Sequence, residues 1–153
     1  MNWKIRKAVQ SDADVITVLR MELLTAAGDV TEENKLKVFH ANQLYFKGKL
    51  ANGLFTAWLA EIHGEVAAIS GLVFFERPPH GENLTGSEAY IMNMYTRPDF
   101  RGMGIARSLL EECISHCKSA NVQRIWLHAS EEGHPLYKQM GFTDKHSEME
   151  LIL

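Results

Sequence analysis

The sequence predicts an α/β (α+β) fold in which helices flank a mixed sheet. Apolar residues recur at helical spacing in segments such as 13–24 and 105–117. Between the helical segments lie short stretches rich in β-branched and aromatic residues, for example 55–62 and 90–96. The chain has 153 residues, of which 46% are hydrophobic and 23% are charged, so we expect a single domain over residues 1–153.

The expected elements follow the order β-α-α-β-β-β-α-β-α-β, with hairpins and one parallel crossover through the third helix. A doubly wound dinucleotide fold would instead alternate strands and helices throughout. The predicted ranges are strand 3–9, helix 12–27, helix 31–52, strand 55–62, strand 65–75, strand 88–96, helix 105–117, strand 122–129, helix 133–140 and strand 148–153.

Turn residues separate these elements. Gly28 ends the first helix, and His63-Gly64 forms a hairpin turn between the second and third strands. Ser70-Gly71 indicates a bend or bulge within the third strand. Segment 77–87 carries prolines and glycines and is expected to be an exposed loop. Apolar residues alternate at the end of the chain, where they predict the last strand: Met149, Leu151 and Leu153.

The central stretch 88–110 reads as a strand, a glycine turn and the start of a helix. Pro98 ends the strand because it has no N–H for the ladder. Gly102 and Gly104 then remove side chains where the helix begins. The first helical N–H groups have no partner within the helix, and the helix dipole places positive charge there. With Arg101 and Arg107 beside it, this turn is predicted to bind a phosphate group.

Two common phosphate motifs fit this turn poorly. A Walker loop is excluded because no Gly-Lys-Ser/Thr follows the glycines. A dinucleotide fingerprint fits in part through Gly102-x-Gly104, but Arg107 stands where its third glycine belongs. A nucleotide-binding oxidoreductase therefore remains an alternative that the strand order disfavours.

Two motifs resemble the GNAT family of N-acetyltransferases. Arg101-x-x-Gly104-x-Ala106 is similar to the family signature Arg/Gln-x-x-Gly-x-Gly/Ala. Downstream, the run from Leu136-Tyr137 to Gly141-Phe142 resembles the family's Leu-Tyr-x-x-x-Gly-Phe segment. The resemblance is tight over 88–142. It implies a mostly antiparallel central sheet whose fourth and fifth strands splay apart, so that the pantetheine arm of acetyl-CoA lies between them.

The resemblance also implies which residues bind the cosubstrate. Pantetheine is expected to pair with the backbone around Met94, Tyr95 and Thr96, and an N–H near Met94 is the expected oxyanion donor. Ser130 is placed across the gap. The pyrophosphate is expected on the glycine turn and the first helical turn: Arg101, Gly102, Met103, Gly104, Ile105, Ala106 and Arg107.

Acetyl transfer to an amine needs a base for the ammonium group and an acid for the leaving thiolate. Tyr137 is the candidate acid, because it matches the family tyrosine near the thioester sulfur. The base is open. Glu88 is the nearest strand carboxylate, although a solvent-exposed edge charge is the alternative interpretation. Tyr90 stands at the family's usual glutamate position, and Glu22 and Asn93 are further candidates.

The resulting prediction is an acetyl-CoA-dependent N-acetyltransferase in which a primary amine attacks the thioester directly in a ternary complex. The alternative is a non-enzymatic acyl-CoA-binding or regulatory module on the same scaffold. The acceptor would be a small molecule or peptide, bound by the first two helices and loop 77–87. The acidic net charge slightly favours a cationic acceptor.

Composition limits the other partners. A formal net charge of -3 argues against a broad nucleic-acid surface. Cys113 and Cys117 share one helix face and are expected to be buried thiols, and the histidines lack metal-ligand spacing, so no metal is predicted. The N-terminal residues hold no apolar signal peptide core, and no apolar run reaches the length of a membrane span. We expect a cytoplasmic protein that binds no membrane, with a homodimer as an open option.

Overall fold

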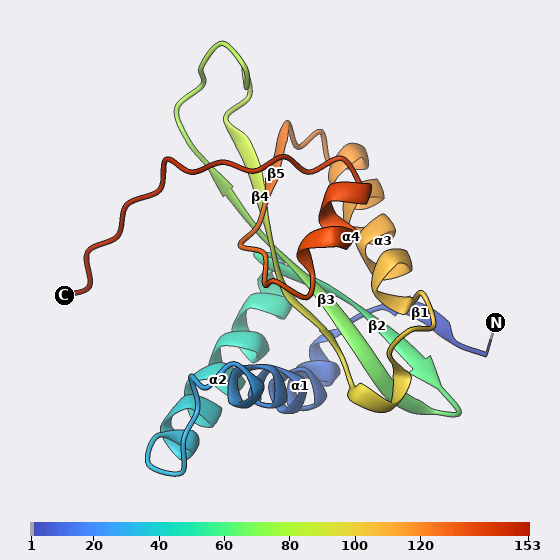
Figure 1. The fold of residues 1–153 in the computed structure, drawn as a ribbon. Helices are drawn as coiled ribbons and strands as arrows, with labels where there is room; N and C mark the ends of the chain where they lie inside the picture. Colours follow the sequence, from blue (N-terminus) through green and yellow to red (C-terminus); the bar gives the residue numbers. More distant parts are fainter. Residues whose placement is uncertain (1) are drawn as a thin grey trace.

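The computed structural model describes residues 2–153 and is built around a five-stranded sheet (Figure 1). The strands lie in the spatial order β1-β2-β3-β4-β5; the first three pairings are antiparallel and β4 pairs with β5 in parallel. The strands are β1 (Lys4–Lys7), β2 (Phe55–Ile62), β3 (Glu65–Glu76), β4 (Ser87–Thr96) and β5 (Arg124–Trp126), and the helices are α1 (Ala13–Ala26), α2 (Lys35–Asn52), α3 (Ile105–Ser119) and α4 (His134–Gln139), with 3₁₀ turns at Gln10–Asp12 and Pro98–Phe100.

Helices cover both faces of this sheet. In Figure 1, α1 and α2 lie on one side of it and α3 and α4 on the other. Each side has its own apolar core. Phe46 of α2 packs with Phe55 and Leu59 of β2, whereas Leu109 and Leu110 of α3 pack in the second core. The predicted buried thiols Cys113 and Cys117 are confirmed, and they belong to that second core.

The predicted irregularity at Ser70-Gly71 is confirmed as a register shift between β3 and β4. Packing explains the glycine, because a Cβ at position 71 would lie 2.6 Å from the ring atom Cζ of Phe55. On the facing strand, Asn93 adopts a left-handed conformation with φ 55°. Two residues of β4 therefore stand opposite one of β3, as in a β-bulge.

The bulge and the short fifth strand open the sheet. β4 pairs with β5 only through Glu88, Ala89 and Tyr90, and β5 ends at Trp126. Residues 91–96 of β4 continue beyond the last rung, so a split separates the two strands there. The predicted parallel crossover is confirmed, but the predicted strand 122–129 was too long.

The predicted last strand is wrong. Residues 143–153, which we call the tail, form no strand and cross the edge of the sheet before extending away from it (Figure 1). The side chains that alternate in sequence are exposed: Met149, Leu151 and Leu153. Polar contacts hold the first part of the tail instead. Asp144 accepts hydrogen bonds from His134 and Lys138 of α4.

Candidate active site

A cavity of about 540 Å³ occupies the split between β4 and β5. Its walls come from the end of α1, Ile69 of β3, the end of β4, the glycine turn, the start of α3, the segment after β5 and α4. Of the residues predicted from sequence, it brings together Met94, Tyr95, Thr96, Arg101, Gly102, Gly104, Ile105, Ala106, Arg107, Ser130 and Tyr137. Met103 and Glu88 do not line this cavity.

The glycine turn leaves a cradle at the start of α3. Gly102 and Gly104 have φ values of 77° and 82°, a left-handed conformation that side chains disfavour. No protein atom lies within 4 Å of where a Cβ would stand at either position. The N–H groups of the first turn of α3 lack intrahelical partners, and this end of the dipole is positive. The turn therefore offers donors and open space to a phosphate group.

Arg101 and Arg107 flank this cradle, and a hydrogen bond holds each of the two side chains. Nε of Arg101 donates to the carbonyl oxygen of Thr96 at 3.0 Å, which ties the turn back to β4. Nη2 of Arg107 donates to Gln139 of α4 at 2.5 Å. Met103 is 44% exposed and does not line the cavity.

Tyr137 closes the cavity from α4. Its side chain is 9% exposed and packs edge-on against Phe142. Burial, followed by nearby Cys113 and Tyr90, raises the pKa of the Tyr137 hydroxyl, so this group stays protonated at neutral pH. Ser130 supports the helix entry, because its Oγ accepts the N–H of Gly133 at 3.1 Å. The arrangement sets a proton donor beside the cavity.

Glu88 lies outside the cavity and is engaged in two ion pairs. Its Oε1 accepts hydrogen bonds from Arg77 at 2.8 Å and from Arg124 at 2.9 Å. The side chain is 1% exposed, so the alternative of a solvent-exposed edge charge is wrong. Burial opposes ionisation, but the two arginines outweigh it and hold the pKa of Glu88 below its usual range. A carboxylate in this state is a poor base. Its two ion pairs instead link β4 to Arg77 in the loop before it and to Arg124 of β5.

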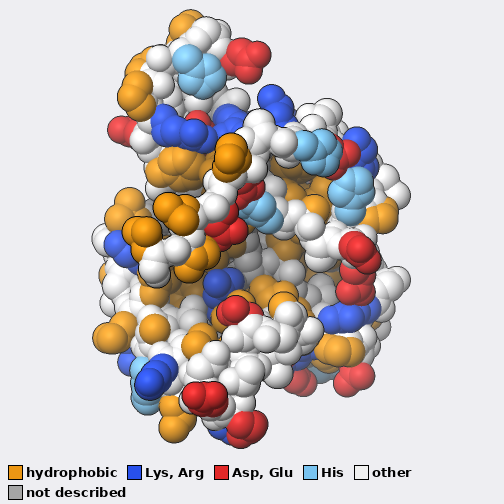
Figure 2. All heavy atoms as spheres, turned by 60° about the vertical axis from the view of Figure 1, so that its left-hand side comes forward, with side chains coloured by type: hydrophobic (Ala, Val, Ile, Leu, Met, Phe, Trp, Pro, Cys, Tyr) orange, Lys and Arg blue, Asp and Glu red, His pale blue; other side chains and the backbone are white. Residues whose placement is uncertain are grey.

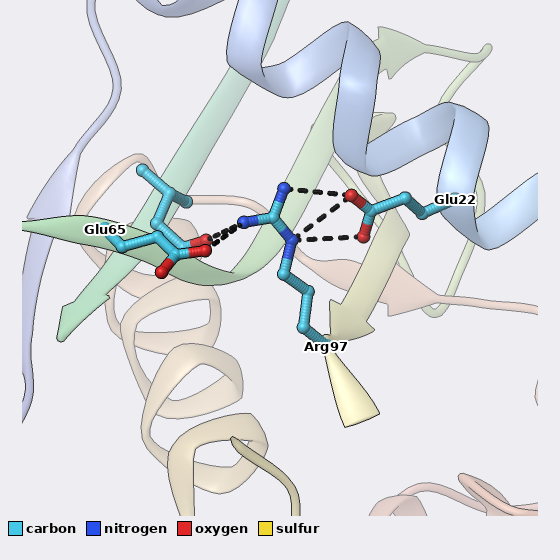
Figure 3. A network of polar contacts seen from close by, with 4 residues as sticks. Glu22, Glu65 and Arg97 are labelled. Carbon is cyan, nitrogen blue, oxygen red and sulfur yellow. Dashed lines mark hydrogen bonds and ion pairs between the residues drawn. The ribbon is translucent and has the colours of Figure 1, made fainter. Parts of the chain in front are cut away.

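Glu22 is also engaged in an ion pair, with Arg97. Arg97, at the end of β4, donates from Nη2 to Glu22 at 2.9 Å and from Nη1 to Glu65 at 2.9 Å (Figure 3). The guanidinium also donates to the carbonyl oxygen of Val66. This network fastens α1 to β3 just before the glycine turn, so it stabilises the cavity wall and leaves Glu22 unsuited to act as the base.

The face of the sheet covered by α1 and α2 holds a second group of polar residues, which we call the acceptor side: Arg20, Asn42, Tyr90, Asn93, His128 and Glu148. Figure 2 shows a hollow near the middle of this face, with basic, acidic and histidine side chains around it. Sequence reasoning missed Arg20, His128 and Glu148. Two signals pointed here: Tyr90, which stands where the family usually has glutamate, and Asn93, which was a further candidate for the base.

Arg20 is the cation of the acceptor side. Its Nη1 donates to Asn93 at 2.7 Å and its Nε to Asn42 at 3.3 Å, and no carboxylate within residues 2–153 forms an ion pair with it. Burial lowers the pKa of Arg20, opposed by the more distant charge of Asp29. Asn93 is 3% exposed, and its Nδ2 is a buried donor with no partner among the described residues. Donors therefore outnumber acceptors around this cation.

The split sheet, the glycine cradle and the buried tyrosine define an acyltransferase. Residues 22–142 match the acetyltransferase (GNAT) family, so the chain belongs to this family. It is 26% identical over 147 residues to a glucosamine 6-phosphate N-acetyltransferase of Arabidopsis thaliana, covering 96% of this chain and 94% of the relative.

Solved structures agree with this assignment. A protein of Clostridium acetobutylicum described as a predicted acetyltransferase, solved with acetyl-CoA, is 34% identical and superposes with a TM-score of 0.88 over 98% of this chain and 96% of that one. A GCN5-related N-acetyltransferase of Ralstonia eutropha is 26% identical, with a TM-score of 0.90 over 99% and 98% of the two chains. Within residues 2–153 no group of side chains is arranged to hold a metal ion, and no helix is long and apolar enough to cross a membrane.

Proposed function

We propose that this chain is an acetyl-CoA-dependent N-acetyltransferase that moves the acetyl group to a primary amine by direct attack in a ternary complex. The observation that carries the proposal is the cavity at the split, which is lined by the start of α3 and by two glycines with open space beside them. The first N–H groups of a helix have no intrahelical partner. The Arabidopsis relative named as an N-acetyltransferase supports the reaction type, and the Clostridium structure named with acetyl-CoA supports the cosubstrate.

The proposed roles follow the walls of the cavity. The turn from Arg101 to Arg107 holds the pyrophosphate, and the backbone of Met94, Tyr95 and Thr96 holds the pantetheine arm across from Ser130. When bound, acetyl-CoA supplies an activated thioester carbonyl. The backbone N–H near Met94 donates to that carbonyl oxygen, and Tyr137 holds the proton that the leaving sulfur requires.

We further propose that the acceptor amine carries an anionic group, which Arg20 binds. Arg20 has no carboxylate partner within residues 2–153, and its Nη2 has no hydrogen-bond partner among them. A partly buried cation without a counter-ion favours an anionic ligand over a cationic one. The phosphate in the name of the Arabidopsis relative's substrate agrees with this reading, whereas the net charge of the chain had favoured cationic acceptors.

Calorimetric titration with acetyl-CoA, with NAD as a parallel control, tests the cosubstrate. Thiol release is then measured with glucosamine 6-phosphate, phosphoethanolamine, their unphosphorylated counterparts and spermidine. We expect acetyl-CoA binding, no NAD binding and faster transfer to the phosphorylated amines. Binding without transfer to any amine supports the non-enzymatic module, and binding of NAD alone overturns the assignment of the glycine turn.

The cytoplasmic location and the homodimer remain predictions. Exposed apolar residues of the tail supply a surface suited to a second copy, namely Met149, Leu151, Ile152 and Leu153. Light scattering of the purified chain measures the mass directly. A monomer at every concentration used in the assays would contradict the homodimer.

A further inference from the structure

Three side chains of the acceptor side form one hydrogen-bonded chain. The hydroxyl of Tyr90 on β4 lies 2.6 Å from Nδ1 of His128, which follows β5. Nε2 of His128 lies 2.5 Å from a carboxylate oxygen of Glu148 in the tail. The three residues come from separate parts of the sequence, and the tail contributes the last of them. This contact is also where the tail crosses the edge of the sheet.

Strand geometry places this chain at the split. Ala89 and Ile91 are buried in the core beneath α3, so the intervening Tyr90 points to the opposite face, where α1 lies. Tyr90 is the last residue of β4 that pairs with β5, and its partner is Trp126. His128, two residues beyond Trp126, shares that face, and its ring lies 5.5 Å from the ring of Tyr90.

The hydrogen bonds assign the proton positions. A carboxylate only accepts, so Nε2 of His128 carries the proton shared with Glu148. Nδ1 then has a free lone pair and accepts the hydroxyl proton of Tyr90. The Tyr90 oxygen keeps lone pairs that point away from His128. This is the order of groups found in carboxylate–imidazole–hydroxyl triads, in which the imidazole takes the hydroxyl proton.

We propose that Tyr90, His128 and Glu148 form a proton relay that deprotonates the ammonium group of the acceptor amine. The N–H bond of the ammonium breaks and its proton bonds to the Tyr90 oxygen. The original hydroxyl proton of Tyr90 passes to Nδ1 of His128, and Glu148 stabilises the imidazolium. The amine nitrogen keeps the electron pair that it needs for attack. The relay rests on the proposed function, since it serves the same acetyl transfer.

The surrounding charges fit this assignment. Burial raises the pKa of Tyr90, so the phenol is neutral and accepts a proton only while it passes its own to His128. The charge of Glu148 raises the pKa of Tyr90 and that of Arg20 on α1 lowers it. Tyr90 in turn raises the pKa of Tyr137 on α4, and Arg124 stacks on Trp126 beside Tyr90. The other two carboxylates considered for the base are engaged in ion pairs. Glu88 pairs with Arg77 and Arg124, and Glu22 pairs with Arg97.

In these roles Tyr90 is the catalytic residue and the other two are positioning residues. The test compares kcat and kcat/KM against pH for Tyr90→Phe, His128→Gln and Glu148→Gln, using the panel amine that the wild type acetylates fastest. A control for the loss of a histidine–carboxylate contact exists in His134, which lies 2.7 Å from Asp144 and makes no contact with Tyr90, His128 or Glu148.

We expect kcat of Tyr90→Phe and His128→Gln to fall about 100-fold at neutral pH, with rates that climb steadily toward alkaline pH because only free amine then reacts. Glu148→Gln is expected to fall about 10-fold, with partial rescue in Glu148→Asp. The three relay variants should bind acetyl-CoA with the affinity of the wild type. The control His134→Gln should keep the wild-type pH profile. Wild-type pH profiles in all three relay variants would overturn the relay while leaving the transferase assignment intact.

Nitrogen NMR of histidine-labelled protein supplies a readout that does not depend on turnover. We expect His128 to be the Nε2–H tautomer and to become a mixture of tautomers in Glu148→Gln. The opposite tautomer in the wild type would overturn the relay. Absence of transfer to every amine by the wild type would overturn the proposed function, and the relay with it.

Discussion

The two sides of the split between β4 and β5 are built in different ways. The cofactor side draws mainly on two segments, 94–109 and 130–139, to which α1 adds Leu23, Ala26 and Ala27 and β3 adds Ile69. Its glycine turn offers backbone groups. The acceptor side joins side chains from α1, α2, β4, the end of β5 and the tail through long-range contacts. Backbone donors suit a cosubstrate common to a whole family, whereas dispersed side chains can change without disturbing that binding. Substitutions on each side should therefore separate the two functions.

The largest expected effect is on the cofactor side. Gly104→Asp forces a side chain into a φ of 82° and places a carboxylate in the cradle that we propose for the phosphate. We expect acetyl-CoA affinity to fall at least about 100-fold by calorimetry, from strain and like charge together. Gly53→Asp is the matched control, because Gly53 has a φ of 76° and open space but lies at the end of α2. Equal losses in both variants would assign the effect to backbone strain alone.

Tyr137→Phe tests whether the cofactor side also acts chemically. Tyr137 lines the cavity and the raised pKa of its hydroxyl keeps the proton bound at neutral pH, so removal of the hydroxyl should lower kcat about 100-fold. The affinity for acetyl-CoA should stay within about twofold, because the aromatic packing against Phe142 is retained. Steady-state kinetics with a saturating amine measure the first quantity and calorimetry the second. Unchanged kcat would remove the acid role from Tyr137.

Arg20→Gln tests the acceptor side alone. It removes the charge but keeps a side chain able to meet Asn93, so the loss should fall on anionic acceptors. A charged hydrogen bond contributes about 1.5–3 kcal/mol, which corresponds to a rise in KM for glucosamine 6-phosphate of roughly 10- to 150-fold. KM for glucosamine and affinity for acetyl-CoA should change little. Similar losses for both amines would show that Arg20 supports the fold of this face instead of binding an anion.

This difference in construction also explains what the sequence could predict. The turn from Arg101 to Arg107 and the run from Leu136 to Phe142 are local, so their residue types and spacing could be matched to the family's motifs, and that resemblance predicted the cavity wall. Arg20, His128 and Glu148 lie far apart in sequence and meet only through folding. Glu88 was expected on the strand, and it is there, but its partners Arg77 and Arg124 come from a loop and from β5. No local pattern distinguishes a base from such an ion pair.

The tail shows a related limit. Alternation of Met149, Leu151 and Leu153 describes which way side chains point in an extended chain, and it predicted a strand. A strand also needs a neighbouring backbone to complete its ladder. Here β5 ends at Trp126, and Asp144 and Glu148 anchor the tail through side chains instead. The alternation therefore correctly predicted an extended backbone for the tail and wrongly predicted that this backbone pairs with a neighbouring strand.

The smallest effect on activity is expected at Glu88, which lies at the closed end of the split. Glu88→Gln keeps the size of the side chain but removes the charge between Arg77 and Arg124, both partly exposed. We expect a loss of about 1–2 kcal/mol in the free energy of unfolding and nearly unchanged kcat.

The contribution of Glu88 to stability depends on pH. Because folding lowers the pKa of Glu88 from 4.5, this contribution is present above that pH and is lost as pH falls through the lower folded pKa. The stability gap between wild type and variant, measured by urea unfolding, should therefore narrow in acid. A large fall in kcat with intact stability would instead return Glu88 to the role of base and weaken the case for Tyr90.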